Sequence, residues 1–204
     1  MSILSDPAVK IVQQWVNNTY RNRTGYGEEI EENGRTGWST VYALTRALQI
    51  ELGIANPVNN FGPTTESRYI AWGEMEEGSV PTDEKGQRIV RILQGACYCK
   101  GYDPGGFNGF FGPKTKAAVQ QLQTDAGLPN RDGKVYAYIF KAFLTMDAYR
   151  LTRNGSQTIR TIQQELNNKY YKTAGVQPCD GHYQRQTNKS RINPRILDIS
   201  SLIL

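Results

Sequence analysis

Three kinds of side chain in this sequence could do chemistry: one histidine, three cysteines and a run of glutamates. His182 is the only histidine, and one imidazole cannot build the histidine-rich zinc site of an amidase or zinc peptidase. Cys179 lies close to it in sequence, but a catalytic cysteine and its histidine normally come from separate elements of a fold. We therefore interpret His182 as a surface residue and predict no Cys-His pair.

The glutamates Glu28, Glu29, Glu31 and Glu32 cluster beside Tyr26. A glycosidase needs two carboxylates about 5 to 9 Å apart, one of them with a pKa raised by an apolar pocket. Glutamates crowded into a glycine-containing loop are solvated instead, so we predict an exposed loop. No glycine-rich phosphate loop, serine-centred elbow or Asp-x-Asp calcium loop is visible. These observations favour a protein that binds rather than catalyses, with no metal and no cofactor.

Composition limits the remaining classes. The 204 residues are 38% hydrophobic and 21% charged, which is typical of a folded chain with room for one ordinary domain or two to three small ones. Cys97, Cys99 and Cys179 form neither a disulfide framework nor a zinc-binding pattern. The net charge of +5 is spread along the chain. No apolar run approaches the roughly 18 residues that span a bilayer, and residues 1–7 do not resemble a secretory signal.

Internal repetition indicates which elements position these residues. Three segments share an apolar spacing of i, i+3 and i+7, which predicts one buried face on each of three helices. A glutamine, Gln14, Gln94 or Gln164, stands two residues after the second apolar position of each. Segments 12–20 and 162–170 also agree beyond chance. The apolar sets are Val9, Val12 and Val16; Ile89, Ile92 and Ala96; and Ile159, Ile162 and Leu166.

A turn of constant pattern follows each of these helices. It reads Asn or Asp, then glycine, then threonine six residues after the glycine, and the first pair tolerates the positive φ of a tight turn. A second helix, a second turn and a last helix complete the first two copies. The sequence therefore predicts an all-α fold of tandem three-helix bundles whose third copy is incomplete. The turns begin at Asn33-Gly34, Asn108-Gly109 and Asp180-Gly181, with threonines at Thr40, Thr115 and Thr187.

At these residues the sequence resembles the peptidoglycan-binding domain family, the three-helix modules attached to many bacterial and phage wall hydrolases. Copy two carries the family pattern from Ile89 to Leu144, whereas copy one matches more loosely because of an insertion, Arg21 to Glu32. The arrangement is also similar to the N-terminal part of larger proteins with a C-terminal glycoside-hydrolase-like domain. The resemblance implies non-catalytic binding of a peptidoglycan glycan or stem peptide, as the targeting part of a cell-wall hydrolase. The matching elements of copy two are Leu93-Gln94, Asn108 to Thr115, Gly127-Leu128 and Asp132-Gly133.

These patterns place repeat 1 at residues 5–72, a linker at 73–86, repeat 2 at 87–147 and a truncated repeat 3 with an aberrant tail at 156–204. In repeat 3, Gln184 replaces a glycine, and Pro194 interrupts the expected helix. We therefore expect a truncation or frameshift near Asn188. Because modules of about 60 residues are marginal alone, we also expect the repeats to pack on each other.

Ligand contacts are expected at the turns, where aromatic rings can stack on sugars and Lys, amides or hydroxyls can bind polar groups. Phe111 and Trp38 are equally what a three-helix module needs to close its core, and for these two we favour that structural interpretation. The expected ligand-binding residues are Tyr102, Asn108, Phe111, Lys114 and Thr115 around the second turn, and Trp38 and Ser39 around the first.

Two alternatives stay open. One is a wall hydrolase whose active site is not recognised. The other is a nucleic-acid-binding helical module, suggested by the pI of 9.1 and by polar residues near the start of one helix. We nevertheless expect peptidoglycan as the partner, with neither nucleic acid nor a membrane. The expected location is the cell wall or the exterior, reached by export or lysis without a classical signal peptide, and otherwise the cytoplasm. The residues behind the nucleic-acid alternative are Lys114, Lys116, Gln120, Gln121 and Gln123.

Overall fold

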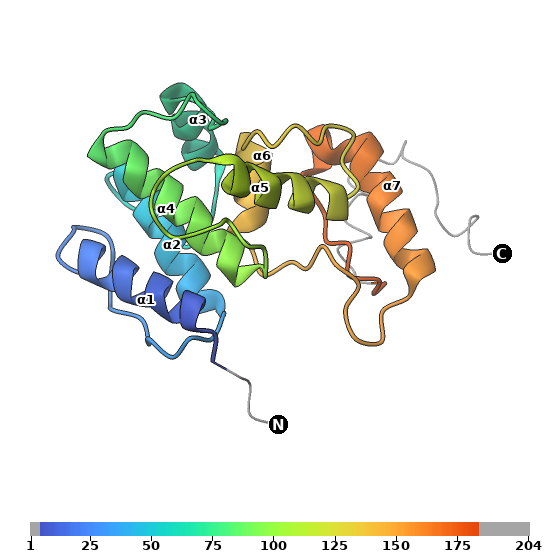
Figure 1. Ribbon diagram of the computed structural model, residues 1–204, viewed down its shortest axis with the longest axis horizontal. Coiled ribbons are helices and arrows are strands. Elements are labelled where there is room, and N and C mark those ends of the chain that lie inside the picture. The colour runs from blue at the N-terminus through green and yellow to red at the C-terminus, as the bar shows by residue number, and fades with distance from the viewer. Residues whose placement is uncertain (1–4, 184–204) are drawn as a thin grey trace. The chain divides into compact units, whose positions relative to one another are not determined.

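The computed structural model describes residues 5–183, and over this range it consists of α-helices and connecting turns without a β-strand. This confirms the predicted all-α class. The expected break near Asn188, together with Gln184, Thr187 and Pro194, lies outside the described residues. Figure 1 labels the helices, which are α1 (Pro7–Tyr20), α2 (Trp38–Glu51), α3 (Pro63–Trp72), α4 (Glu84–Cys99), α5 (Pro113–Asp125), α6 (Ala137–Phe143) and α7 (Gln157–Ala174).

Local sequence explains where several helices begin. Proline occupies the start of α3 and α5, where its missing N–H costs nothing. The side chain of Asp6, Asp83 or Ser156 accepts a backbone N–H in the first turn of α1, α4 or α7. Such N-caps stabilise a helix by about 1 kcal/mol each.

The chain divides into two compact units. Of the described residues, 5–124 and 129–147 form the first unit, while 125–128 and 148–183 belong to the second. The first two expected repeats thus share one unit, and the third falls in the other. The boundaries of the individual repeats stay a prediction.

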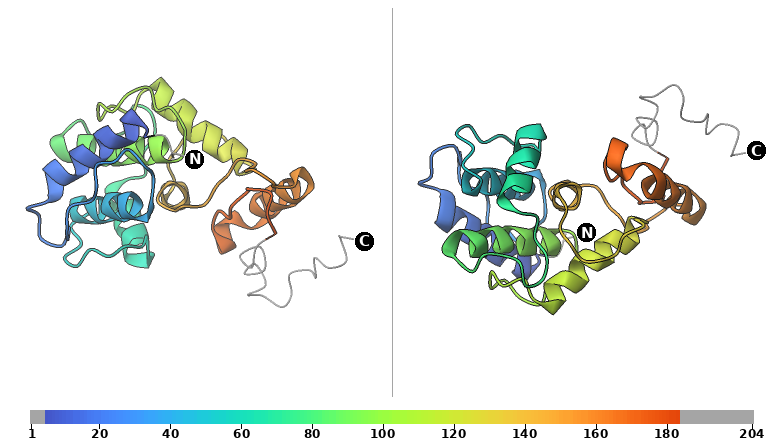
Figure 2. Two further views of the ribbon diagram at one scale, coloured as in Figure 1. Left: turned by 90° about the horizontal axis from the view of Figure 1, so that it is seen from below. Right: turned by 90° about the horizontal axis from the view of Figure 1, so that it is seen from above.

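In the first unit, α1, α2 and α4 pack together, as Figure 1 and the two views of Figure 2 show. The predicted stripe of α1 is fully covered, since Val12 and Val16 are 0% exposed. A Cβ atom on Gly95 of α4 would lie 2.7 Å from Cγ1 of Val12, so the absence of a side chain lets α4 approach α1. A helix from the second expected repeat therefore completes the core around the first.

A buried carboxylate links the same three helices. Glu51 at the end of α2 accepts hydrogen bonds from Arg88 Nε of α4 at 2.8 Å and from the Tyr20 hydroxyl of α1 at 3.0 Å. Removing either donor would leave buried charge less well compensated, which is costly.

Within residues 73–86, which are expected as a linker, Met75 is packed into the first unit. Met75 is 1% exposed and forms an isolated antiparallel bridge with Val135. The Tyr69 hydroxyl of α3 accepts the Met75 N–H at 3.1 Å and donates to the Val135 carbonyl at 2.7 Å. The Tyr69 ring also meets Phe140 of α6 edge to face, with ring centroids 5.1 Å apart. This segment thus joins α3 to α6.

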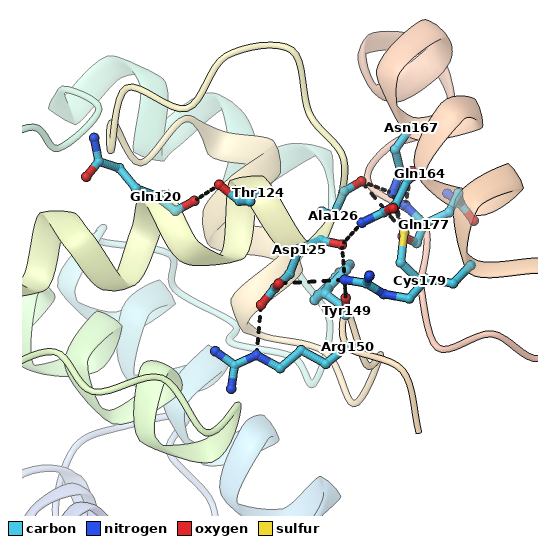
Figure 3. A network of polar contacts seen from close by, with 11 residues as sticks. Gln120, Thr124, Asp125, Ala126, Tyr149, Arg150, Gln164, Asn167, Gln177 and Cys179 are labelled. Atoms are coloured by element: carbon cyan, nitrogen blue, oxygen red, sulfur yellow. Dashed lines mark hydrogen bonds and ion pairs between the residues drawn. The ribbon is translucent and has the colours of Figure 1, made fainter. Parts of the chain in front are cut away.

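In the second unit, side chains of α7 bind the carbonyl groups of residues 125 and 126, as Figure 3 shows. Gln164 Nε2 donates to the Asp125 carbonyl at 2.9 Å, and Asn167 Nδ2 donates to the Ala126 carbonyl at 2.9 Å. The Asp125 carboxylate accepts from Arg150 Nε at 2.8 Å. Carbonyl groups that end a helix need such partners.

Candidate functional site

A buried glutamine holds the first predicted turn in shape. Gln13 of α1 accepts the Gly34 N–H on Oε1 at 2.8 Å. Its Nε2 donates to the Arg35 carbonyl at 3.1 Å and to the Thr40 hydroxyl at 3.0 Å. One carboxamide therefore satisfies donors and acceptors on both sides of the turn, and it connects α1 to the start of α2. We call this arrangement a glutamine clamp.

The same clamp recurs at four other turns. In each, a glutamine that is at most 4% exposed accepts a backbone N–H on Oε1 and donates from Nε2 to a carbonyl of the turn. A buried amide with both ends satisfied contributes to stability, whereas an unsatisfied one costs about 1–3 kcal/mol. The clamps and their N–H donors are Gln49 with Val58, Gln94 with Gly109, Gln123 with Gly133, and Gln163 with Gly181.

The glutamine at the constant spacing of the three repeats is a clamp in only one of them. Gln94 is both the repeated glutamine and a clamp, whereas the clamps of the other two copies are Gln13 and Gln163, next to Gln14 and Gln164. One residue along a helix rotates a side chain by about 100°, so these neighbours face elsewhere. The usable signal was the apolar-Gln pair of Leu93-Gln94, which also occurs at 48–49 and 122–123.

Backbone geometry explains the glycine in these turns. Gly34, Gly109, Gly133 and Gly181 have φ between 70° and 81°, a conformation that L side chains rarely adopt. Each also gives its N–H to a clamp. The predicted Asn/Asp-Gly turns are confirmed at all three first-turn positions.

Three of the expected ligand-binding residues lie in the core. Tyr102, Phe111 and Thr115 are 4%, 3% and 1% exposed. The Thr115 hydroxyl donates to the Pro104 carbonyl at 3.0 Å and accepts from the Gln94 clamp at 3.3 Å. Because these side chains cannot reach a ligand in this conformation, we keep only the exposed members of the expected set. The structural interpretation of Phe111 is confirmed.

The exposed members are Asn108, Lys114, Trp38 and Ser39. The structural interpretation of Trp38 was wrong, because its side chain is 53% exposed. Its ring instead stacks on Tyr42, one helical turn further along α2, with centroids 5.2 Å apart. Sequence spacing alone did not indicate which face of α2 is buried, because the covering helix comes from another repeat.

The second turn borders a groove of about 300 Å³, which we name the Phe110 groove. One side is the turn itself, with Asn108 and Phe110, and the other is the segment 78–82. Phe110 is 66% exposed, and its ring lies over Gly112, where a Cβ atom would come within 2.7 Å of the ring. None of the described residues that line this groove is charged. The groove therefore offers an aromatic face and neutral polar groups.

Asn108 is fixed by the turn but keeps a donor. Its Oδ1 accepts from the Phe110 N–H at 2.9 Å and from Gln94 Nε2 at 3.1 Å. The backbone N–H of Asn108 donates to Gln94 Oε1 at 3.1 Å. The orientation of the carboxamide is thus set by contacts through its oxygen, and Asn108 is one of the residues that line the groove.

The residues considered for catalysis have other roles in the structure. His182 is half-buried and uses its main chain in the third turn, donating to Asp180 Oδ1 at 2.9 Å and accepting from Gln163 at 3.0 Å. Burial raises the pKa of Cys179 to about 12, and Asn167 Nδ2 donates to its sulfur at 3.2 Å. A thiol with this pKa is protonated at neutral pH and is a poor nucleophile. Within residues 5–183, no group of three His, Cys, Asp or Glu side chains is placed to hold a metal ion.

The residues behind the nucleic-acid alternative also make contacts within the fold. Lys116 pairs with Glu77 at 3.1 Å, and Gln120 donates to the Arg131 carbonyl at 3.1 Å. Gln123 is a clamp and is 0% exposed. Among the described helices, none combines the length and apolar character needed to cross a bilayer.

Comparison with known proteins agrees with this helical architecture. A family model described as putative peptidoglycan binding domain matches residues 87–135, which include the second turn and the Gln94 clamp. A second model, described as FadG/YbfG, PGDB-like domain, matches residues 5–97 and 152–196, more than half of the chain. The chain therefore belongs to the FadG/YbfG, PGDB-like domain family, and the resemblance to peptidoglycan-binding domains is confirmed.

Two relatives come from Bacillus subtilis (strain 168). The uncharacterized proteins FadG and YbfG are each 49% identical to this chain, over 189 and 187 residues respectively. These stretches cover 92% of the chain in both cases, but only 32% of FadG and 25% of YbfG. The chain thus spans about a third and a quarter of the length of these relatives. No solved structure matches the chain.

Proposed function

We propose that this chain binds the glycan strand of peptidoglycan through the Phe110 groove and does not itself cleave it. The observation that carries the proposal is an uncharged groove with an exposed aromatic ring, whose Phe110 wall lies inside the stretch that matches the putative peptidoglycan binding domain. The apolar face of an N-acetylated sugar would stack on Phe110, and its acetamido or hydroxyl oxygens would accept from Asn108 Nδ2. Lys114, also exposed, lies just beyond the turn.

A binding module of this kind would serve a longer protein. Since the relatives are three to four times longer than the matched stretch, we propose that it brings another part of such a protein, a wall hydrolase, to the cell wall. Repeated modules that each bind weakly gain strength when linked, because the second contact becomes intramolecular.

The test is co-sedimentation of the purified chain with insoluble peptidoglycan. Phe110→Ala should weaken binding about tenfold, which corresponds to the roughly 1.4 kcal/mol that a stacked aromatic ring contributes. Ile70→Ala is the matched control, because Ile70 is 53% exposed on α3 and does not line the groove. Equal binding by wild type and Phe110→Ala would refute the assignment of the groove.

Two further measurements separate the alternatives. Release of reducing sugar or new amino groups from the same walls would indicate hydrolysis and contradict a purely binding role. Binding to duplex DNA with strong salt dependence would instead support the nucleic-acid alternative. We expect neither signal from the chain.

A further inference from the structure

The loop of residues 21–32, which distinguishes the first repeat from the second, forms one wall of another groove. This open groove has a volume of about 700 Å³. The opposite wall is the outer face of α2, with Ser39, Tyr42 and Arg46. We name it the Tyr42 groove. Its existence depends on the loop, so it is a property of this repeat and not of the three-helix module in general.

The loop is held in place, which gives the groove a fixed wall. Tyr26 is 0% exposed, and its hydroxyl donates to Asn17 Oδ1 at 3.0 Å. Asn17 Nδ2 in turn donates to the Ile30 carbonyl at 2.8 Å. The loop also touches the far side of the groove, where a Cβ atom on Gly25 would lie 2.4 Å from the Pro57 ring. A pre-formed wall reduces the entropy lost when a ligand binds.

An aromatic pair on α2 lies at this groove: Tyr42 lines it, and Trp38 lies one helical turn before Tyr42. Trp38, Tyr42 and Arg46 are spaced by four residues and so share one side of the helix. The Trp38 and Tyr42 rings stack at an interplanar angle of 29°. Because each ring covers one face of the other, the half-exposed Trp38 ring offers the apolar surface on which the C–H face of a sugar ring can pack.

Arg46 joins the loop to α2 in the wall of the groove. Its guanidinium lies over the Tyr26 ring, with Cζ 5.5 Å from the ring centroid, and one amino group donates to Asn59. The Nε atom is buried and has no hydrogen-bond partner among the described residues. Because protein atoms cover this Nε, Arg46 contributes to the wall of the groove through its packing on Tyr26.

The charge of this groove differs from that of the Phe110 groove. Glu28, Glu29 and Glu31 line it, and Arg46 is the only cationic side chain among its described lining residues. Arg21 approaches Glu29 at 3.7 Å, but both side chains are about half exposed, so solvent screens the pair. The excess of carboxylates attracts a cation to the edge of the aromatic pair.

We propose that the Tyr42 groove binds a hexosamine unit whose amino group is free and therefore cationic. The sugar ring packs on the exposed Trp38 ring beside Tyr42, and the ammonium group lies near Glu28 and Glu29. This site goes beyond the proposed function. It is separate from the Phe110 groove, and it selects a sugar with a free, charged amino group, whereas the Phe110 groove is proposed to bind an N-acetylated sugar.

Isothermal titration calorimetry with two soluble probes tests this assignment. In mildly acidic buffer, a β-1,4 tetramer of glucosamine should bind the wild-type chain about tenfold or more tightly than the tetramer of N-acetylglucosamine at this groove, and salt should weaken it. Both Trp38→Ala and the double variant Glu28→Gln/Glu29→Gln should reduce this binding about tenfold. The control Glu66→Gln/Glu165→Gln removes two exposed carboxylates outside the groove and should leave it unchanged.

Each outcome bears on the site. No binding of the amino tetramer, equal binding of both tetramers to this groove, or an equal loss in the control variant would overturn the proposal. Phe110→Ala should leave binding of the amino tetramer intact while it weakens binding to walls. If the wild-type chain binds the amino tetramer but not walls, the assignment of the Phe110 groove has failed. If it binds walls but not the amino tetramer, the assignment of the Tyr42 groove has failed.

Discussion

Helices α1 and α7 follow the same sequence pattern, and each holds the chain after it with an asparagine as well as a glutamine clamp. Asn17 accepts the Ile30 N–H at 3.0 Å and donates to the Ile30 carbonyl at 2.8 Å. Asn167 accepts the Gln177 N–H at 2.8 Å and donates to the Gln177 carbonyl at 2.8 Å. The polar interactions that shape the turn are therefore the same in both places.

The apolar stripes of the two helices differ in how far they are covered. In α1 the stripe is buried under α2 and α4, whereas the corresponding positions of α7 are only half-buried. The comparison shows that turn geometry is set by local polar contacts and does not require a closed core around the helix. The half-buried positions of α7 are Ile159, Ile162 and Leu166.

Removing the clamps should produce the largest effects. Gln13→Ala leaves the Gly34 N–H and the Thr40 hydroxyl without their partner, and we expect the free energy of unfolding to fall by about 3 kcal/mol. Gln163→Ala should cost about 2 kcal/mol, because the third turn is less deeply covered. All three tryptophans belong to the first unit, so their fluorescence follows its unfolding while far-UV circular dichroism follows both units.

The neighbouring glutamine provides the control. Gln14 is half-buried and holds no turn, so Gln14→Ala should change the stability by only about 0.5 kcal/mol. If Gln14→Ala and Gln13→Ala were equally destabilising, the clamp would not be the source of the effect.

Apolar truncation sharpens the comparison at a smaller scale. Val12→Ala removes fewer atoms than Ile162→Ala, yet it should be more destabilising, by about 2 kcal/mol against about 1 kcal/mol, because Val12 is 0% exposed and Ile162 is half-buried. Urea unfolding, read by fluorescence for the first variant and by circular dichroism for the second, measures both values. A larger loss for Ile162→Ala would mean that the α7 stripe is covered as completely as that of α1.

The helices and turns could be predicted because their signals are local. Asn33-Gly34 and Asp180-Gly181 need the positive φ that the dipeptide tolerates, and the spacing to Thr40 reflects a hydrogen bond that the structure contains. The repeated spacing did not indicate the clamp glutamines of two copies, because it aligned Ile92, rather than Leu93, with Val12. The i, i+3, i+7 spacing of apolar residues cannot tell which of two adjacent buried residues, such as Ile92 and Leu93, corresponds to a given position of another helix.

The candidate sites were less predictable because exposure depends on packing between distant segments. Thr115 and Trp38 occupy similar positions, because each lies in the first turn of the helix that follows a predicted turn. Thr115 nevertheless contacts a glutamine clamp, whereas Trp38 is exposed to solvent. The glutamate loop was correctly expected to be exposed. Its role as a wall of a groove depends on the contacts of Tyr26 and Asn17, which join elements that the sequence pattern treated separately.

The smallest expected effect concerns one chemical difference between the two asparagine clamps. Asn17 Nδ2 donates to the Glu32 carboxylate at 3.1 Å, whereas Asn167 Nδ2 donates to the Cys179 thiol. Burial raises the pKa of Cys179 from 9.0 to about 12 in the folded chain. The folded state therefore holds the thiol proton more tightly than the unfolded state, and this stabilising contribution is complete below pH 9 and is lost as the pH rises toward 12.

Cys179→Ser keeps an acceptor for Asn167 but removes this titration. Between a pH of about 8 and about 10, the wild-type chain should lose about 1 kcal/mol more of its free energy of unfolding than Cys179→Ser does. Urea unfolding followed by circular dichroism at both pH values gives the difference, in which the tyrosines and the other two cysteines cancel. If the free energy of unfolding fell equally in the two proteins, the thiol would ionise as readily in the folded chain as in the unfolded chain. Asn167 would then tolerate a charged partner at Cys179, as Asn17 does at Glu32.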